Sequence, residues 1–428
     1  MKNLRILLSV LLVIAMLAAA SAALAEGYSV DVLEVKIWDP VQLKGLQEIA
    51  DLWTEQSGVK VNIQVVDWGN YWTLLEAGAS GGEMPDVFWM HSNNAQMYMA
   101  ANKLLDLTDY IAASDVVDLD NYYPGITELY SLNDRNYAIA KDHDTIALLY
   151  NKAIFDQYGV AYPDETWTWE DYKAAAEAIT EASGGEVYGA ACNTSNDQDC
   201  YFNIIYDFGG YVISEDKKSS GWDNENTIKA MNFVGSLMEK AWAPQPMVAE
   251  NGTDRLFKNA KAAMISQGSW MINDFYTYEG SENFAWAMLP YEDVNGNGQV
   301  DEGERCSIYN GLGWAASADT KDPNAAWSLI EWFSSQEMQL KQAELGVTMG
   351  GYLGISDAFA NAFPGMDVSA FLKMESEGTL VFRPYSKYTS RWSDQYQREL
   401  VTAWNDPTQM EGILRNLASE MNALLAQE

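Results

Sequence analysis

Short apolar segments alternate with amphipathic segments along residues 33–90, and this alternation limits the folds open to the chain. Residues 33–38, 59–66 and 86–90 have the pattern of strands, whereas 41–57 and 71–79 carry apolar residues at helical spacing. Gly58 follows the first helical segment, as expected at a helix end. The alternation predicts a mostly parallel sheet covered by helices, with ligands bound at the carboxyl ends of its strands.

The later sequence keeps the α/β character. Thr168 and Asp171 predict a capped helix running to about residue 180, and further helices are expected over 226–242 and 324–345, the last of them ended by Gly346. The length of 428 residues suits two ordinary domains. No Pro/Gly/Ser-rich linker separates them. Either the domains pack tightly, or the chain crosses between them more than once.

Residues 1–25 have the features of a secretory signal. Lys2 and Arg5 precede an apolar stretch that ends in Ala23-Leu24-Ala25, a pattern typical of a cleaved signal peptide. The alternative is a membrane anchor, because the apolar stretch is long enough to span a bilayer. A lipid anchor would require a cysteine at the cleavage point, and the first cysteine is Cys192. We therefore expect a periplasmic or secreted protein that is not embedded in the membrane.

Composition excludes several classes of partner and site. The chain has 61 acidic and 26 basic residues, and a net charge of −35 repels nucleic acids and anionic lipids. Two histidines argue against a metal centre built on histidine, and three cysteines argue against a disulfide scaffold. Export nevertheless permits a disulfide, and Cys192 and Cys200 bracket a polar loop that suits a short bridge, leaving Cys306 over. Spacing alone does not fix this connectivity.

Six short motifs occur in order between residues 82 and 327. They are Gly82-Glu83-Met84-Pro85-Asp86-Val87-Phe88; Tyr137-Ala138-Ile139-Ala140 with Ala147-Leu148-Leu149-Tyr150-Asn151-Lys152; Tyr162-Pro163-Asp164-Glu165-Thr166-Trp167-Thr168-Trp169; Ala262-Ala263-Met264 with Gly268-Ser269-Trp270; Gly311-Leu312-Gly313-Trp314; and Ala326-Trp327. Each motif is weak by itself, but the ordered series resembles the extracellular solute-binding proteins of ABC sugar importers, the group that includes maltose-binding protein.

The resemblance implies a two-lobed periplasmic-binding-protein fold of α/β class, type II-like, with the ligand in the cleft between lobes joined by crossing segments. It places residues 26–141 and 314–350 in lobe 1, and 142–313 and 351–428 in lobe 2. It also implies hinge closure on the ligand and delivery to the permease subunits of an ABC transporter.

A sugar site needs aromatic planes for the apolar faces of the sugar and polar side chains for its hydroxyls. Suitable residues occur at strand ends and in the segments that cross between the lobes. Each of them also has a purely structural alternative to ligand binding, which is core packing, helix capping, a hinge position or a surface ion pair. An anionic ligand requires clustered Arg or Lys residues, and the sequence shows no such cluster. We therefore expect a neutral ligand. The candidate ligand-binding residues are Trp38, Asp67, Trp68, His91, Asp142, Asp144, Trp270, Trp314, Tyr352, Arg383 and Arg391.

Residues 293–304 match the twelve-residue calcium loop of EF-hands, which has oxygen ligands at positions one, three, five, seven, nine and twelve and glycine at six. Gly298 stands at position six. The alternative is an acidic hairpin turn, but such a turn does not require carboxylates at positions one, nine and twelve. Since 284–290 and 307–309 read as strands, we expect a structural Ca²⁺ site that joins two strands. Its ligands are Asp293, Asn295, Asn297, the backbone carbonyl of Gln299, Asp301 and Glu304.

The leading hypothesis is a monomeric, non-enzymatic protein that captures a carbohydrate, such as an oligosaccharide or glycoside, for an ABC permease. A secreted glycoside hydrolase is the first alternative, because its chemistry needs two carboxylates and the chain has many. The motifs G-x-S-x-G, H-E-x-x-H and the Walker glycine loop are absent from the sequence. A binding protein for a polyamine or a peptide is the second alternative, since an acidic cleft suits a polycation.

Overall fold

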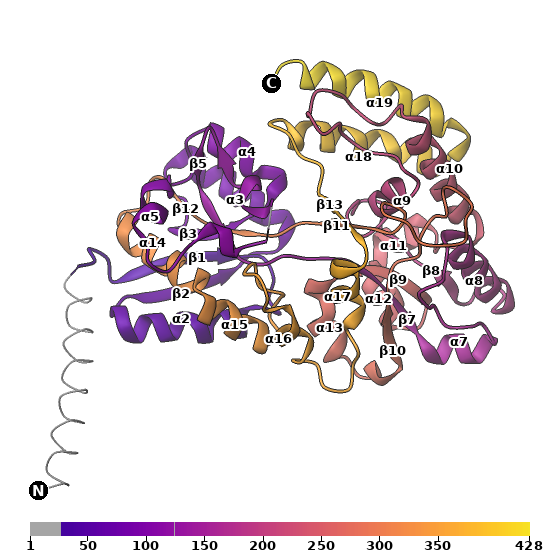
Figure 1. The fold of residues 1–428 in the computed structure, drawn as a ribbon, viewed down its shortest axis with the longest axis horizontal. Helices are drawn as coiled ribbons and strands as arrows, with labels where there is room; N and C mark the ends of the chain where they lie inside the picture. Colours follow the sequence, from indigo (N-terminus) through magenta and orange to yellow (C-terminus); the bar gives the residue numbers. More distant parts are fainter. Residues whose placement is uncertain (1–26, 124) are drawn as a thin grey trace, which may run out of the picture. The chain divides into compact units, whose positions relative to one another are not determined.

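The computed structural model describes residues 27–123 and 125–428, and the described chain divides into two compact units (Figure 1). Unit 1 comprises the described residues up to His91, Tyr98–Asp142 and Leu312–Leu353; unit 2 comprises Ser92–Met97, His143–Gly311 and Gly354–Glu428. The chain changes unit after residues 142, 311 and 353, where the resemblance implies crossings after 141, 313 and 350. The predicted signal, residues 1–25, lies outside the described residues.

Unit 1 is built on a five-stranded sheet in the order β2-β1-β3-β12-β6. Strands β1 (Val32–Ile37), β2 (Lys60–Val65) and β3 (Val87–Met90) are mutually parallel, which confirms the prediction from the alternating pattern. Strand β12 (Gly313–Ala316) lies antiparallel between β3 and β6 (Ala138–Ala140). The carboxyl ends of β1, β2 and β3 therefore share one edge of the sheet.

The helices of unit 1 follow from their apolar stripes and end signals. In α2 (Leu43–Ser57), Leu46, Ile49 and Trp53 are buried, and Gly58 ends the helix with φ 76°. The single helix predicted over 324–345 is wrong: Ser335 takes an extended conformation with ψ 147° and its hydroxyl caps a second helix by accepting from Met338 N–H at 3.3 Å. The other helices and strands are α3 (Trp68–Gly81), α4 (Ser92–Ala100, shared with unit 2), α5 (Thr108–Ala113), α6 (Ile126–Leu129), α14 (Pro323–Ser334), α15 (Gln336–Glu344), β4 (Ser131–Leu132) and β5 (Arg135–Asn136).

Unit 2 is built on a four-stranded mixed sheet in the order β10-β7-β9-β8. Strand β7 (Ile146–Asn151) is antiparallel to β10 (Phe284–Ala287) and to β9 (Ala262–Gly268), while β8 (Tyr188–Ala190) is parallel to β9. A separate parallel pair joins β11 (Cys306–Tyr309) to β13 (Thr379–Phe382). Because Ile146 pairs with Gly268, the start of β7 shares an edge with the carboxyl ends of β8 and β9.

Helices surround this sheet and bury a core rich in aromatic residues, which includes Trp169, Tyr201 and Trp222. The predicted capping box of α8 is confirmed, because the Thr168 hydroxyl accepts from Asp171 N–H and the Asp171 carboxylate accepts from Thr168 N–H. The long helices α18 and α19 pack against each other near the carboxyl end of the chain (Figure 1). The helices are α7 (Lys152–Tyr158), α8 (Trp169–Ala182), α9 (Tyr201–Asp207), α10 (Glu225–Lys240), α11 (Gln245–Asn251), α12 (Thr253–Lys258), α13 (Ile272–Tyr276), α16 (Ser356–Ala360), α17 (Ser369–Ser376), α18 (Thr389–Asn405) and α19 (Met410–Leu425).

The disulfide between Cys192 and Cys200 is present, which confirms the pairing suggested by the polar loop. Cys306 is a buried free thiol whose pKa is raised by burial and by the neighbouring Asp207. Among the described residues, the helices are too short or too polar for any of them to cross a lipid bilayer.

Candidate functional site

An aromatic cluster lies at the carboxyl edge of the parallel strands of unit 1. Trp38 follows β1, Trp68 opens the helix that follows β2, and His91 follows β3. Because β1, β2 and β3 are parallel, these three positions are brought to one edge of the sheet. We define the aromatic cluster as Trp38, Trp68, Tyr71, Trp72, Trp89 and His91.

Trp38 is the centre of the aromatic cluster. Its ring lies edge-on to Trp68 at 5.1 Å between centroids and edge-on to Trp89 at 4.9 Å. The ring centroids of His91 and Trp68 are 5.4 Å apart. Trp89 is buried, whereas 46% of Trp68 is exposed. About half of the Trp68 side chain is therefore in contact with solvent while neighbouring rings hold it in place, and an aromatic ring held in this way can stack on a sugar ring.

A buried lysine lies beneath the aromatic cluster. Lys141 has no exposed surface, and its ammonium lies 4.5 Å from the centroid of the Trp89 ring. The ammonium forms an ion pair with Asp142 at 2.6 Å and donates to Gln42 Oε1 at 2.8 Å. The second oxygen of Asp142 accepts from Leu312 N–H at 2.7 Å. Asp142 therefore joins the first crossing segment to the second within unit 1, and both of its oxygens are occupied.

The other sequence-predicted residues of unit 1 have different surroundings. Asp67 is exposed and caps α3, and hydrogen bonds from Asn70 lower the pKa of its carboxyl. Trp314 is 0% exposed, and its ring stacks on Phe333 with 4.5 Å between centroids. It therefore packs in the core, which was the alternative to ligand binding, and it is not part of the proposed site. Tyr352 is partly buried and packs edge-on against Tyr122 at 5.4 Å.

Unit 2 brings a second set of predicted residues to one edge of its sheet. Asp144 precedes β7 and Trp270 follows β9, and these ends of the two strands are paired. The Trp270 ring lies directly over Gly268, where a Cβ atom would come within 2.0 Å of the ring. Glycine at this position thus allows the indole to fold back over the end of β9. The loop that follows β8 is the disulfide-closed loop 192–200.

Arg383 lies in the interior of unit 2 and directly follows β13. It is 7% exposed and forms an ion pair with Asp197, a residue of the disulfide-closed loop that is not among the predicted ligand-binding residues. Arg391 lies instead on the surface, with its guanidinium 4.4 Å from the centroid of the Tyr388 ring. The structure therefore brings Asp144 and Arg383 into the neighbourhood of the disulfide-closed loop and leaves Arg391 outside it.

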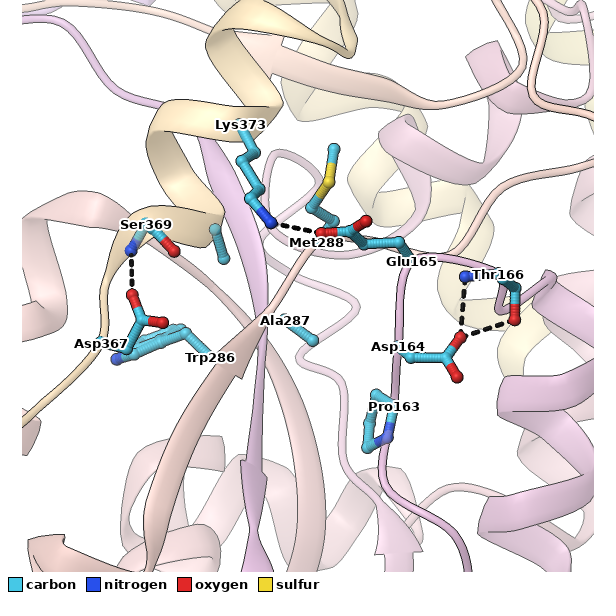
Figure 2. A pocket seen from close by; sticks show the side chains of 11 residues that line it. Pro163, Asp164, Glu165, Thr166, Trp286, Ala287, Met288, Asp367, Ser369 and Lys373 are labelled. Atoms are coloured by element: carbon cyan, nitrogen blue, oxygen red, sulfur yellow. Dashed lines mark hydrogen bonds and ion pairs between the residues drawn. The ribbon is translucent and has the colours of Figure 1, made fainter.

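A cavity of about 360 Å³ in unit 2 has a different lining (Figure 2). Figure 2 shows the ion pair between the lining residues Lys373 and Glu165, and Asp164 accepting hydrogen bonds from the backbone and hydroxyl of Thr166. None of the predicted ligand-binding residues lines this cavity, and its charged groups are engaged with neighbouring residues. Its lining residues are Pro163, Asp164, Glu165, Thr166, Trp286, Ala287, Met288, Asp367, Ser369, Ala370 and Lys373.

The predicted calcium loop is a compact turn between β10 and β11. Asp293 accepts from the backbone N–H groups of Asn297 and Gly298 at 3.0 and 2.8 Å, and the two oxygens of Glu304 accept from Val294 and Asp301 at 3.0 Å each. Gly298 has φ 72°, as the sharp turn at position six requires. Throughout residues 27–123 and 125–428, no group of three or more His, Cys, Asp or Glu side chains is gathered in a way that could hold a metal.

Several residues that build these clusters were not predicted as site residues. Trp72 stands one helical turn after Trp68 on α3, and its spacing of four residues is the signal that could have identified it. Asp197 and Gln198 lie in the polar loop between Cys192 and Cys200, but the sequence of that loop does not show which of its side chains point inward. Lys141 had no signal, because a lysine is rarely fully buried.

Two compact α/β units, each with aromatic or polar side chains gathered at one edge of its sheet, define a two-lobed binding protein. Residues 38–340 match the family model described as bacterial extracellular solute-binding protein, and the chain belongs to that family. The resemblance stated from the motifs and the α/β class are thereby confirmed.

Relatives of the chain include named sugar-binding proteins. A maltotriose-binding protein of Pyrococcus abyssi is 26% identical over 339 residues, which cover 77% of this chain and 68% of the relative. A maltooligosaccharide ABC transporter solute-binding lipoprotein of Streptococcus pneumoniae is 22% identical over 325 residues, which cover 74% of this chain and 71% of the relative.

Solved structures share the fold at low sequence identity. An ABC substrate-binding protein of Listeria monocytogenes, solved in complex with cycloalternan, has a TM-score of 0.81 at 21% identity and covers 92% of this chain and 99% of its own. The GacH receptor of Streptomyces glaucescens, solved unliganded and with acarbose, has a TM-score of 0.80 at 19% identity, with 92% and 98% covered.

Proposed function

We propose that the protein binds a carbohydrate outside the cytoplasm and delivers it to the permease of an ABC transporter. The observation that carries the proposal is the aromatic cluster, in which the half-exposed Trp68 is held edge-on by the ring of Trp38. Such a ring can stack on the apolar face of a sugar. Family membership and the names of the relatives support the same class of ligand.

The charges around the two clusters favour a neutral sugar. The buried cations Lys141 and Arg383 are paired with Asp142 and Asp197, respectively, so their charges are already compensated within the protein. An anionic ligand would have to compete with these carboxylates. We expect an oligosaccharide or a glycoside, whose sugar rings have apolar faces on which an aromatic ring can stack.

The protein acts in this proposal as a binder and not as an enzyme. Glycoside hydrolysis needs one carboxyl as acid and a second as base or nucleophile. Asp142 has both oxygens engaged, and Asp144 accepts from Gln198 and from Asn310 N–H. Carboxylates already committed to these hydrogen bonds are poorly suited to act as the acid and the base or nucleophile of hydrolysis. Binding is expected to close the two units on the sugar by bending at the crossing segments, so that the permease recognises the closed form.

The test is thermal melting of the mature chain against maltooligosaccharides, erythritol, glycosides, spermidine and short peptides. A ligand that binds only the folded protein and is present at one hundred times its Kd adds about 2.7 kcal/mol to the free energy of unfolding. A shift produced by one sugar family, with the sugar recovered intact, is the expected result. Cleavage of the sugar would establish the hydrolase alternative. A shift produced only by spermidine or peptides would overturn the carbohydrate assignment.

The exported form is proposed to be a released, monomeric chain that begins at Glu26. A pneumococcal relative is named a lipoprotein, whereas this chain has no cysteine near the expected cleavage point. Intact mass spectrometry of the exported protein tests this directly. A mass matching residues 26–428 is expected, and retention of residues 1–25 would support the membrane-anchor alternative.

Calcium binding by residues 293–304 is a further part of the proposal. The support is the oxygen-only donor set at the spacing of an EF-hand loop and the left-handed Gly298. Asn295 and Asn297 donate their amide N–H groups to Asp301 in the structure. In the proposed bound form, these two amides present their oxygens to the ion instead. The ion would stabilise the connection from β10 to β11 and take no part in sugar binding.

A further inference from the structure

Residues of the disulfide-closed loop of unit 2 bind the guanidinium group of Arg383. Arg383 Nη1 donates to Gln198 Oε1 at 3.0 Å, Nη2 pairs with Asp197, and Nε donates to Asn93 Oδ1 at 2.9 Å. A guanidinium is planar and presents its donors in a fixed fork, so three partners in three directions fix its orientation. Two of these three partners are consecutive residues of the disulfide-closed loop.

The same loop also holds Asp144. Gln198 Nε2 donates to Asp144 Oδ1 at 2.8 Å, while Gln198 Oε1 accepts from Arg383. An arginine can only donate and a carboxylate can only accept, so the Gln198 amide has a single orientation that satisfies both neighbours. One side chain thus bridges two residues that the sequence predicted as ligand-binding.

Contacts from the core hold the loop itself in place. The second oxygen of Asp197 accepts from the buried Tyr396 hydroxyl, and the Gln198 carbonyl accepts from Asn203 Nδ2 at 2.8 Å. Asp197, Gln198 and Asn203 are all buried. The disulfide closes the ends of the loop, with a sequence separation of 8. Breaking it would return chain freedom to a segment of polar residues.

We propose that Asp197 and Gln198 are positioning residues that orient Arg383 and Asp144 for the ligand, and that the disulfide between Cys192 and Cys200 keeps them in register. This inference rests on the proposed function for its ligand, although the orientation of Arg383 can be measured without one. On this proposal, opening the disulfide lowers the affinity for the sugar and reduces the difference in affinity between the sugars that the protein prefers and those that it rejects. Unit 2 remains folded, because its hydrophobic core is unchanged.

The experiment uses the full mature chain and two variants that loosen the loop by different routes. The double variant Cys192→Ser/Cys200→Ser opens the disulfide, and Gln198→Leu removes the bridging amide while the disulfide and the Asp197 ion pair remain. Gln245→Leu is the matched control: Gln245 holds the other end of the same loop through Thr194 Oγ1 at 2.8 Å and the Cys192 carbonyl at 3.0 Å, away from Arg383.

The first readout needs no ligand. Hydrogen exchange of the Arg383 Nε–H, assigned in an NMR spectrum by its loss in Arg383→Lys, reports whether the guanidinium is held. Exchange is expected to accelerate by about tenfold in both loop variants, and to change little in Gln245→Leu. Unchanged exchange in both loop variants overturns the proposal, whether or not a sugar has been found.

The second readout is the Kd of the sugar that stabilises the wild type, measured beside the melting temperature. We expect affinity to fall by about tenfold in Gln198→Leu, with cooperative melting retained. Faster exchange with unchanged affinity and selectivity overturns the ligand role. If the wild type binds no carbohydrate while exchange accelerates as expected, the proposed function fails and the positioning of Arg383 by the loop is supported. Should the double cysteine variant not fold, Gln198→Leu still decides the question.

Discussion

Trp68 stands edge-on to Trp38, with their ring centroids 5.1 Å apart and their planes inclined by 80°. Trp89 and Tyr71 hold the Trp38 ring in place. Trp38 in turn fixes the orientation of the Trp68 ring, although 46% of Trp68 is exposed to solvent. A rigid exposed ring loses little conformational entropy when a ligand stacks on it, which distinguishes it from an isolated surface tryptophan.

Replacing Trp68 by alanine is expected to weaken sugar binding by about tenfold, or ~1.4 kcal/mol, because the stacking face is lost. The ligand-free melting temperature should fall only slightly, because about half of the Trp68 side chain lies in solvent. Isothermal titration with the sugar found in the melting panel measures the effect. Trp68→Phe keeps a flat ring and should recover part of the affinity, and Trp404→Phe is a control in unit 2. Full affinity in Trp68→Ala would remove Trp68 from the site.

Replacing Asp142 by asparagine is expected to lower the free energy of unfolding by about 3–5 kcal/mol, because the buried Lys141 ammonium loses its counter-ion. Urea unfolding measures the loss. The double variant Lys141→Met/Asp142→Asn removes both charges and should recover most of the stability. Wild-type stability in the single variant would show that Asp142 does not balance the lysine.

Replacing Asp199 by asparagine is expected to raise the melting temperature at neutral pH. Burial raises the pKa of this carboxyl well above its ordinary value of 3.8, and the charges of Asp254 and Asp197 raise it further. The folded protein therefore holds Asp199 in its protonated form more tightly than the unfolded chain does, and stability falls as the pH rises from about 3.8 through the folded pKa. Asparagine removes this loss and leaves stability unchanged at more acidic pH.

The difference between variant and wild type in melting temperature, followed from pH 3 to pH 8, tests this prediction. Asp216 provides a control of opposite sign, because hydrogen bonds from the Ser214 hydroxyl and from Lys218 N–H lower the pKa of this exposed carboxyl. Asp216→Asn should therefore cost stability above pH 3.8, and this cost should fade as the pH falls from 3.8 through the lower pKa of the folded state. A lower melting temperature for Asp199→Asn at neutral pH would contradict the burial argument.

Calcium is expected to raise the melting temperature of the wild type, by an amount equivalent to about 2.7 kcal/mol at one hundred times the Kd. Glu304→Gln removes the carboxylate at position twelve of the loop and should abolish this shift, whereas Glu302→Gln removes an equal charge outside the ligand set and should keep it. Calorimetric titration with CaCl₂ measures binding directly. Calcium-induced shifts in melting temperature of equal size in both variants would contradict the prediction, as would the absence of a shift in the wild type. Either result would show that the loop is only an acidic turn.

Local patterns predicted much of the fold. Apolar spacing identified β1, β2 and β3, and Thr168 with Asp171 identified the start of α8, because these features depend on neighbouring residues. The break at Ser335 was missed because apolar residues continue on both sides of it, although serine is a common helix cap. The antiparallel insertion of β12 depends on pairing with β3 and β6, which no local pattern encodes.

The candidate site was predictable in part for the same reason. Trp38 and Trp68 follow strands and could be placed at a sheet edge by topology alone. The burial of Lys141 could not be predicted, because its partners Gln42, Trp89 and Thr348 come from separate stretches of the chain. The glycine-rich crossing before Trp314 predicts a ligand-binding position, but the Trp314 ring is buried and stacks on Phe333.

The position of β12 between β3 and β6, inside the sheet of unit 1, has a consequence for how the chain acquires its structure. Strand β3 ends at Met90 and its neighbour begins only at Gly313, so a chain emerging from its amino end holds an incomplete sheet until most of unit 2 has followed. Unit 2 in turn waits for β13, α18 and α19. Pairings over such long sequence separations form slowly. The sheet of unit 1 is therefore expected to be completed only late in synthesis, and a chain that is not yet folded is the form in which the proposed export across a membrane would take place.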